Sequence, residues 1–468
     1  MSNKQDSTLQ KKQQLDSLKE KLSKSNAFLK NLFLIMVIIT VIYCVDEITS
    51  NINLMRPYMI YDLFKIPNQD ASSQQYADAI SKMAIATIPT YIITMLLPLY
   101  KSLSDKYGRK PLLVINVLGM GIGMLICMVA PNYMAYIIGT VVFGFFTPND
   151  IQVIYIMEVA PKERRATYCS VTKGIALLSV SLIGVLRSIF YNPADVTTWR
   201  LVFLVPVVIA IAVGVLSMFL IKETPVFLQQ RIDYLEQNDE ELQKLEEEVP
   251  TEKTVKGGFK EAIHFMFHDH QVRNLILIDL LFMCAVALTG YAAETMLAYG
   301  QSDANMNIFY VVEPVVYAVF AFFSGFLTDW LGRKKSGILF GCLALICQVA
   351  FVFLARAGAS PVLLALSNGL MYGGLWSFSD LLYIVVPAES VPTEMRATVV
   401  GLLQYTALSN MALTIVIGVL YSSIGSKNIG LLQLAFFVPF MLLAIFYVKK
   451  HLRETSDVDL NEAGRESL

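Results

Sequence analysis

Charged residues are scarce in this chain of 468 residues: Asp, Glu, Lys and Arg make up 16% of it, whereas apolar residues make up 55%. Soluble domains of ordinary composition carry roughly 25% charged residues. The shortage therefore excludes an ordinary soluble protein and directs attention to the apolar runs.

Two further absences exclude classes of chemistry. No G-x-x-x-x-G-K-[ST] loop occurs, so the sequence gives no support for ATP-driven transport by this chain. No C-x-x-C pair occurs either, and we interpret the cysteines as packing residues with free thiols rather than metal ligands. All six lie in apolar segments: Cys44, Cys127, Cys169, Cys284, Cys342 and Cys347.

Long apolar runs are what the chain has in abundance. Runs of about 20 apolar residues predict membrane-spanning helices. We predict twelve such helices, over residues 30–55, 83–101, 111–130, 133–157, 167–190, 201–221, 273–298, 306–328, 336–355, 361–388, 397–422 and 428–448.

Positive charge is unevenly distributed between the loops. Lys and Arg crowd residues 1–26, the 101–110 loop and the 222–273 segment, whereas the alternate loops carry few of them. Positively charged loops stay in the cytoplasm, so we expect both termini there and an even number of helices. No cleavable signal peptide is apparent in the polar residues 1–26, so the first helix is expected to direct insertion.

A charged loop occurs once in each half of the chain. The segment D-K-Y-G-R-K at residues 105–110 returns as D-W-L-G-R-K at residues 329–334, an offset of 224. Glu158, Pro161 and Arg165 return as Glu389, Pro392 and Arg396 at an offset of 231, as do Glu223 and Thr224 as Glu454 and Thr455. Such internal repeats are typical of transporters built from two helix bundles.

These motifs resemble those of the major facilitator superfamily. The 329–334 loop completes the signature G-x-x-x-D-x-x-G-[RK]-[RK] from Gly325 onward, whereas the first copy has Lys101 in place of the leading glycine. The other motifs resemble the E-x-x-P-x-x-x-R and P-E-[ST]-P-R elements of sugar porters and their relatives, including organic cation transporters. The resemblance implies an all-α integral membrane protein in which twelve transmembrane helices form two pseudo-symmetric six-helix bundles.

The expected organisation follows from the spans and the repeat. We expect a mobile, partly helical cytoplasmic N-terminal tail over residues 1–26, a first bundle over 27–222, a cytoplasmic linker over 223–271, a second bundle over 272–450 and a cytoplasmic C-terminal tail over 451–468. Within the linker, His264 and His268 lie one helical turn apart, and we interpret this segment as an interfacial helix rather than a metal site.

The repeated charges are expected to form a cytoplasmic gate and scaffold, because Arg forks can hold carboxylates of neighbouring helices in one state and release them in another. Its candidates are Asp105, Gly108, Arg109, Glu158, Arg165, Glu223, Asp329, Gly332, Arg333, Glu389, Arg396 and Glu454.

Polar residues near the membrane midplane are candidates for the substrate site. Asp150 precedes Glu158 by eight residues and Lys173 follows Arg165 by eight, which places both about 12 Å from the cytoplasmic rim and predicts an ion pair. Asp380 and Gln404 take the matching depth in the second half. The substrate-binding candidates are Asn149, Asp150, Lys173, Gln404, Glu47 and Trp376. The alternative is that these groups only join helices by hydrogen bonds.

Three carboxylates are candidates for proton coupling: Asp46, Asp380 and Glu313. Asp46 lies where sugar porters carry an aspartate associated with coupling, but Ile137 and Ile138 replace the arginine expected opposite it. Asp46 therefore needs another partner, such as Lys173 or Arg187, or a bound proton.

Four other charged groups have structural interpretations. We expect Glu47 to be a structural or water-exposed acid if it does not bind substrate, Glu294 to lie at the outer mouth, Asp279 to lie at the membrane interface, and Arg187 to snorkel from its helix end.

The sequence thus predicts a multi-pass protein of the plasma (cell inner) membrane, with no enzymatic activity, that moves a small polar organic solute by alternating access with proton symport. The alternatives are proton-driven efflux of amphipathic organic cations and a non-transporting solute sensor. Residues 281–284 lack the glutamine pair of sugar porters, so hexose is not implied. The surplus of midplane acids favours protons, an organic cation or a zwitterion. We expect a monomer whose partners are the solute, protons and the lipid bilayer, without nucleic acid, metal or cofactor.

Overall fold

The computed structural model describes residues 2–29, 31–97, 100, 103–104, 107–147, 151–161, 165–236, 259–287, 289–391 and 396–455. In these ranges the regular structure is helical. Within the described residues, ten helical spans are long and apolar enough to cross a membrane. The two other expected spans correspond to α4 with α5, and to α20 with the turns that follow it.

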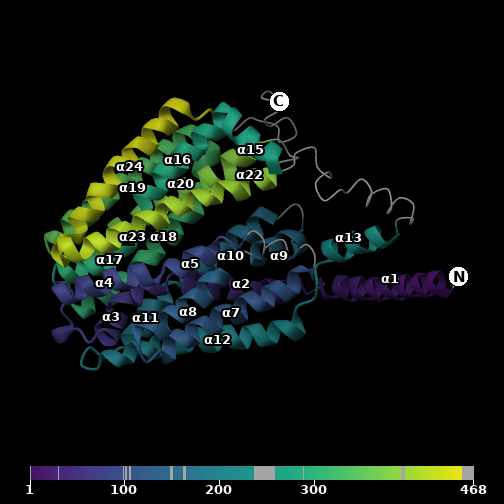
Figure 1. Cartoon of the computed structure of the whole chain (residues 1–468), viewed down its shortest axis with the longest axis horizontal. Coiled ribbons are helices and arrows are strands. Elements are labelled where there is room, and N and C mark those ends of the chain that lie inside the picture. Colours follow the sequence, from purple (N-terminus) through teal and green to yellow (C-terminus); the bar gives the residue numbers. More distant parts are fainter. Residues whose placement is uncertain are drawn as a thin grey trace.

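The first half of the chain forms one bundle and the second half forms another beside it (Figure 1). The first bundle contains α2 (Leu32–Ser50), α3 (Arg56–Leu63), α4 (Gln74–Ala86), α5 (Ile88–Thr94), α7 (Arg109–Val129), α8 (Tyr133–Phe146), α9 (Ile151–Val159), α10 (Arg165–Ser179), α11 (Ser181–Phe190) and α12 (Trp199–Leu220). The second contains α16 (His270–Val286), α17 (Ala292–Ala298), α18 (Asp303–Leu331), α19 (Arg333–Arg356), α20 (Pro361–Asp380), α21 (Val386–Ser390), α22 (Arg396–Leu403), α23 (Ala407–Ile424) and α24 (Ile429–His451).

Local sequence fixes where these helices begin and end. The side chains of Asn132, Asp269, Ser302 and Ser360 accept hydrogen bonds from the first turns of α8, α16, α18 and α20, as expected of N-cap residues. Gly332 separates α18 from α19 with a φ of 81°, a conformation that glycine adopts without steric cost. The α-helical pattern of α20 ends at Asp380 and continues as a π-helical turn, η7 (Leu381–Val385).

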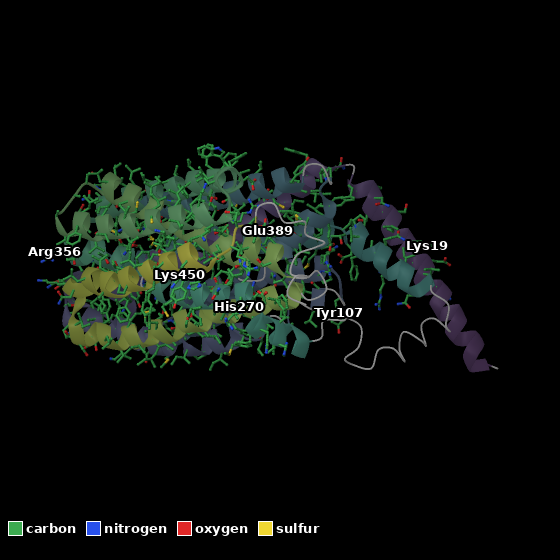
Figure 2. The ribbon with its side chains drawn as sticks, turned by 90° about the horizontal axis from the view of Figure 1, so that it is seen from above. Lys19, Tyr107, His270, Arg356, Glu389 and Lys450 are labelled. Carbon is green, nitrogen blue, oxygen red and sulfur yellow. The ribbon has the colours of Figure 1, made fainter. Side chains whose placement is uncertain are left out.

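The two ends of the bundles differ. We call the end that carries Gly108 and Gly332 the motif end, and the other the opposite end. Figure 2 places Tyr107 and Glu389 toward the motif end and Arg356 at the opposite end. One hydrophobic core cluster runs through the first bundle and takes in second-bundle residues 287–310, 351–365 and 417–432, which are those nearest the opposite end. A separate cluster lies within the second bundle alone. The bundles therefore share a core at the opposite end.

Two segments outside the bundles are helical as well. The N-terminal segment, expected to be a partly helical tail, forms the helix α1 (Ser2–Leu29), which packs against α13 (Pro225–Glu236) in the linker (Figure 1). Its Lys and Glu residues favour helix, and Lys24 pairs with Glu20 one turn earlier at 2.6 Å. The linker also contains α15 (Phe259–His268), whose Phe265 and Met266 are buried. Residues 237–258 of the linker lie outside the described residues.

Candidate functional site

An ion pair joins the two bundles. Lys173 on α10 and Asp380, the last residue of α20, approach to 3.2 Å between Nζ and Oδ2. Their side chains are 42% and 47% exposed, so water or a solute can reach both groups. Sequence reasoning placed the two residues at one depth and predicted pairs of Lys173 with Asp150, which stays a prediction, and of Asp380 with Gln404. The structure pairs Asp380 with Lys173, and Asp150 lies outside the described residues.

A cavity of about 310 Å³ extends from this pair toward the motif end. Its described charged lining is balanced, because Lys173 and Arg333 stand against Asp329 and Asp380. The remaining lining residues are small or apolar: Gly174, Leu177, Ala321, Phe322, Ser324, Gly325, Thr328, Ser377, Leu381 and Val385.

The opposite end is closed by contacts between the bundles. Arg56 of the first bundle pairs with Glu294 of the second at 2.6 Å and also donates to the carbonyl of Gly290. Arg187 pairs with Asp303 across the same interface at 2.5 Å. These pairs require the bundles to be in contact, so the opposite end has no open path between them at this point.

Aromatic rings and polar groups surround these two pairs. The guanidinium of Arg187 lies 4.3 Å from the ring centre of Tyr58 and 4.7 Å from that of Tyr191, and Arg56 lies 4.2 Å from that of Tyr291. The Tyr310 hydroxyl donates to the Leu54 carbonyl across the interface at 2.7 Å. Arg187 is 1% exposed, so the expectation that it snorkels is wrong: it is held inside the interface by its anion and its rings.

Two candidate proton-coupling carboxylates have amide partners. Gln152 on α9 donates through Nε2 to Oδ2 of Asp46 at 2.7 Å, and Asp46 is 6% exposed. Glu313 on α18 is buried as well, and Asn368 on α20 donates to it at 3.4 Å. Sequence reasoning did not find Gln152, although a lone amide within an apolar span was a signal for it. Arg187, considered as a partner of Asp46, instead binds Asp303.

The motif end carries the same network twice. In the first bundle, Arg109 pairs with Glu158 at 2.9 Å, and Glu223 accepts from the backbone N–H groups of Arg109 and Lys110. Burial raises the pKa of Glu223, while these N–H donors and that of Thr224 act in the opposite direction. The Thr224 hydroxyl donates to Glu158 and completes the set.

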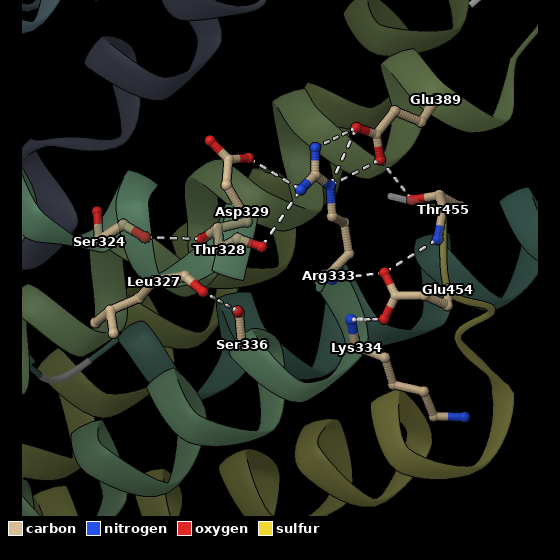
Figure 3. Close-up of polar contacts among 10 residues, drawn as sticks. All are labelled: Ser324, Leu327, Thr328, Asp329, Arg333, Lys334, Ser336, Glu389, Glu454 and Thr455. Atoms are coloured by element: carbon tan, nitrogen blue, oxygen red, sulfur yellow. Dashed lines mark hydrogen bonds and ion pairs between the residues drawn. The ribbon is translucent and has the colours of Figure 1, made fainter. Parts of the chain in front are cut away.

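The second copy repeats this arrangement residue for residue. Arg333 pairs with Glu389 at 2.7 Å, Glu454 accepts from the backbone N–H groups of Arg333 and Lys334, and the Thr455 hydroxyl donates to Glu389 (Figure 3). Arg333 also pairs with Asp329 at 3.1 Å. The first copy joins helix ends of the first bundle, and the second copy joins helix ends of the second bundle. Neither copy links the two bundles to each other in this state.

The glycines of both loops are required by this geometry. Gly108 has a φ of 104° and Gly332 a φ of 81°, values that favour glycine. A Cβ at Gly108 would lie 2.2 Å from Oε2 of Glu223, and one at Gly332 would lie 2.7 Å from Oε2 of Glu454.

Several predicted site residues are not brought to the cavity. Trp376 lies one turn before Asp380 on α20 and Gln404 lies in the 3₁₀ turn η8 (Gln404–Thr406), but neither lines the cavity as described. Glu47 is partly buried on α2 beside Asp46. Asp105 and Asn149 lie outside the described residues, as do the side chains of Arg165 and Arg396.

Asp279 and Glu294 differ from their sequence-based interpretation. Asp279 is 0% exposed within the second bundle, so its expected place at the membrane interface is wrong: it turns toward the bundle core. Glu294 is buried in its pair with Arg56 rather than exposed at a mouth. In the described part of the chain, no group of three or more His, Cys, Asp or Glu side chains could hold a metal ion.

Comparison with known proteins identifies the architecture. A family model described as Major Facilitator Superfamily matches residues 31–412. The inward-open xylose transporter XylE of E. coli superposes with a TM-score of 0.66 at 16% identity, covering 93% of this chain and 99% of that one. A crystal structure of a D-xylose-proton symporter also gives 0.66, at 15% identity, covering 92% and 100% of the two chains.

Curated relatives are distant. A putative proline/betaine transporter of Staphylococcus haemolyticus is 23% identical over 54% of this chain and 53% of its own length. An arabinose-proton symporter of Bacillus subtilis is 23% identical over 64% and 68% of the two chains. Sugar transport protein 10 of Arabidopsis thaliana is 24% identical over 78% and 74%. The chain spans about half or less of the length of several of the relatives that it matches.

Proposed function

This chain belongs to the major facilitator superfamily, and we propose that it is a secondary active transporter that moves a small polar organic solute by alternating access with proton symport. Its family and its fold, which resembles that of the xylose transporter, indicate a transporter rather than an enzyme. The solute, the coupling ion and the residues that serve them are our proposal.

The observation that carries the proposal is the half-exposed Lys173–Asp380 pair, which lies in a cavity between two bundles that are closed at the opposite end. A solute that binds there contacts both bundles at once. Transport then requires the bundles to rock about this site, so that the Arg56–Glu294 and Arg187–Asp303 pairs part while the motif end closes.

We place the motif end in the cytoplasm and the protein in the plasma membrane. The described positively charged segments α1, 107–110, 222–231 and 333–335 lie at this end, and positive charge is retained on the cytoplasmic side. The bacterial origin of several transporter relatives is consistent with a cell membrane. In this orientation the structure represents the inward-facing state.

Asp46 is our first candidate for the coupled proton, followed by Glu313 and Asp380. An amide is a neutral partner: it donates to a carboxylate, and its oxygen can accept from the protonated acid. Gln152 can therefore remain a hydrogen-bond partner of Asp46 in both of its protonation states. The relatives named as proton symporters support protons as the driving ion.

Reconstituted vesicles test this function. We expect an inward proton gradient to drive accumulation of labelled solute above its external concentration, and Asp46→Asn to reduce this accumulation more than it reduces solute exchange at equal pH. Glu20→Gln, an exposed change on α1, is the matched control. Accumulation by Asp46→Asn and Glu313→Asn at the wild-type level would contradict the coupling assignment.

A further inference from the structure

One buried carboxyl group inside the second bundle has no part in the proposed transport site. Asp279 on α16 is 0% exposed, and neither of its carboxylate oxygens has a hydrogen-bond partner in the described part of the chain. An ionised carboxylate without a partner is strongly disfavoured inside a protein, because burial removes its hydration and gives nothing in return. The neutral carboxylic acid, which carries a proton, fits this position.

The surroundings of Asp279 are apolar. It shares the buried face of α16 with Leu275, Ile278 and Phe282, and these three residues belong to the hydrophobic core cluster of the second bundle. The turn η7 packs against α16 and contributes to the same cluster. Asp279 follows the start of α16 by nine residues, which places it about 13 Å along the helix from that end. It therefore lies in the apolar core of the bundle.

Among the described residues, no charged side chain acts on Asp279. The titratable groups of α16 and of the elements packed against it have other contacts, or are exposed. Arg273 and His270 of α16 contact each other, as do His264 and His268 of α15, Tyr447 and His451 of α24, and Tyr291 of η6 with Tyr421 of α23. Glu389 of α21 binds Arg333, whereas Lys449, Lys450 and Tyr405 are exposed.

Tyr383 of η7 is the titratable neighbour that a charge on Asp279 would reach. Its hydroxyl lies 2.5 Å from that of Thr406 in η8, and Thr406 donates its own proton to the Leu403 carbonyl. Tyr383 must therefore donate to Thr406, so its oxygen can only accept from Asp279. Since only a protonated carboxyl group can donate, this neighbour also suits a neutral Asp279.

The two turns that carry Tyr383 and Thr406 interrupt helices of the second bundle. The turn η7 is π-helical and begins directly after Asp380, whereas η8 is a 3₁₀ turn between α22 and α23. Both pack against α16. Such π-helical turns within α-helices are frequent at functional sites. The charge state of Asp279 therefore bears on the segment that begins at a residue of the central cavity.

We propose that Asp279 is a proton-binding site of the second bundle, that it is occupied in this state, and that its proton keeps η7 and η8 packed against α16. An ionised Asp279 would place a charge in an apolar core, so loss of the proton requires these turns to part from α16 and admit water. The inference goes beyond the proposed function, because Asp279 is fully buried away from solvent and the site does not depend on which solute is moved.

The pH dependence of unfolding tests the inference on the full-length protein in detergent. Asp279→Asn is an uncharged analogue of the proton-bound form. An aspartate in the unfolded chain is ionised above about pH 4, so folding of the wild type takes up a proton there and folding of the variant does not. We expect the folding equilibrium constant of Asp279→Asn, divided by that of the wild type, to rise about tenfold per pH unit from pH 5 to pH 8.

Asp62→Asn is the matched control. Asp62 is 2% exposed and so is buried as well, but it pairs with Lys65 and Arg200. It is therefore ionised in both the folded and the unfolded chain above pH 5, and the corresponding ratio should stay constant. A constant ratio for Asp279→Asn would overturn the inference, since it would show that Asp279 is charged in the folded protein.

A second variant and a second cation complete the test. Asp279→Val fills the site with an apolar side chain and should give the same slope, because the slope comes from the proton bound by the wild type. Failure of both variants to fold would show that the site needs a negative charge and would overturn the inference. Stabilisation of the wild type by NaCl over KCl, abolished in Asp279→Asn, would assign the site to a metal cation instead of a proton and would overturn it as well.

Discussion

Arg187 offers the sharpest test of how the bundles close at the opposite end. It is 1% exposed, pairs with Asp303 of the other bundle and lies over the rings of Tyr58 and Tyr191. Removing one partner of a buried pair costs about 3–5 kcal/mol. The side chain of Asp303 is 36% exposed, so water compensates part of this loss. We therefore assign about 2 kcal/mol to the loss of the Arg187–Asp303 pair.

The contacts of Arg187 with aromatic rings add to this free-energy cost. Contact of a guanidinium with an aromatic face contributes about 0.5–1 kcal/mol. Tyr58 and Tyr191 belong to the same bundle as Arg187, so only part of their contribution depends on closure. A total of about 3 kcal/mol corresponds to a shift of about 100-fold in the equilibrium between closed and open opposite ends. Arg187→Gln should therefore populate the state in which this end is open.

Distances between spin labels report this shift directly. In a background without the six native cysteines, exposed positions Asp70 and Lys427 carry labels at the opposite end, and Tyr107 and Trp330 carry labels at the motif end. With Arg187→Gln we expect the first distance to lengthen and the second to shorten.

Arg200→Gln is the matched control. Arg200 also binds a buried carboxylate, Asp62, and lies over Trp199, but all three belong to the first bundle. The control should lower the thermal stability and leave both distances unchanged. Equal distance distributions in wild type and Arg187→Gln, in protein that stays folded, would refute the reasoning.

Three other predictions follow from single sites. Gly332→Ala should lower the free energy of unfolding by about 2–3 kcal/mol, because the new Cβ displaces Glu454 and alanine disfavours a positive φ. Gly425→Ala, at a φ of 82° with nothing within 4 Å of its Cβ, should lower it by only about 1 kcal/mol. Equal losses for the two variants in denaturant titrations would contradict the clash with Glu454. Burial alone would raise the pKa of Asp62, but hydrogen bonds from Lys65, Arg200 and Trp199 hold it below its usual value. Asp62 thus contributes stability that is present above its unfolded pKa of about 4 and is lost as the pH falls through its lower folded pKa; Asp62→Asn should flatten the acid side of the melting-temperature profile, and an unchanged acid slope would exclude this role. Glu389→Gln should weaken the Arg333 pair and lower the melting temperature more than the exposed change Asp329→Asn does; the reverse order would contradict the network.

The sequence was sufficient to predict the part of the candidate site in which a motif repeats. Equal offsets between Glu158 and Glu389, and between Glu223 and Glu454, predicted two copies of one network, and the structure contains both. The glycines before Arg109 and Arg333 were part of the same pattern, and their positive φ values explain why this residue type is needed there.

Counting along helices gives depth but not direction. Lys173 and Asp380 were correctly placed at one level, yet nothing in the count shows that both point across the bundle interface. The same limit explains the errors at Arg187 and Asp279, which were assigned to helix ends but are buried against neighbouring helices. The sequence allowed partial helix in residues 1–26 but not the place of α1, because its contacts with the linker join residues more than 190 positions apart, such as Ser25 and Glu223.

The central claim is that transport requires the bundles to part at the opposite end, and a reversible cross-link there tests it most directly. The Gln74 amide donates to the Ser422 carbonyl across the interface at 2.5 Å, so Gln74→Cys with Ser422→Cys places two thiols on facing helices. The account predicts that a short disulfide-containing cross-linker abolishes counterflow in proteoliposomes, and that reduction restores it. Counterflow that continues at the uncross-linked rate in fully cross-linked protein would contradict alternating access through this site.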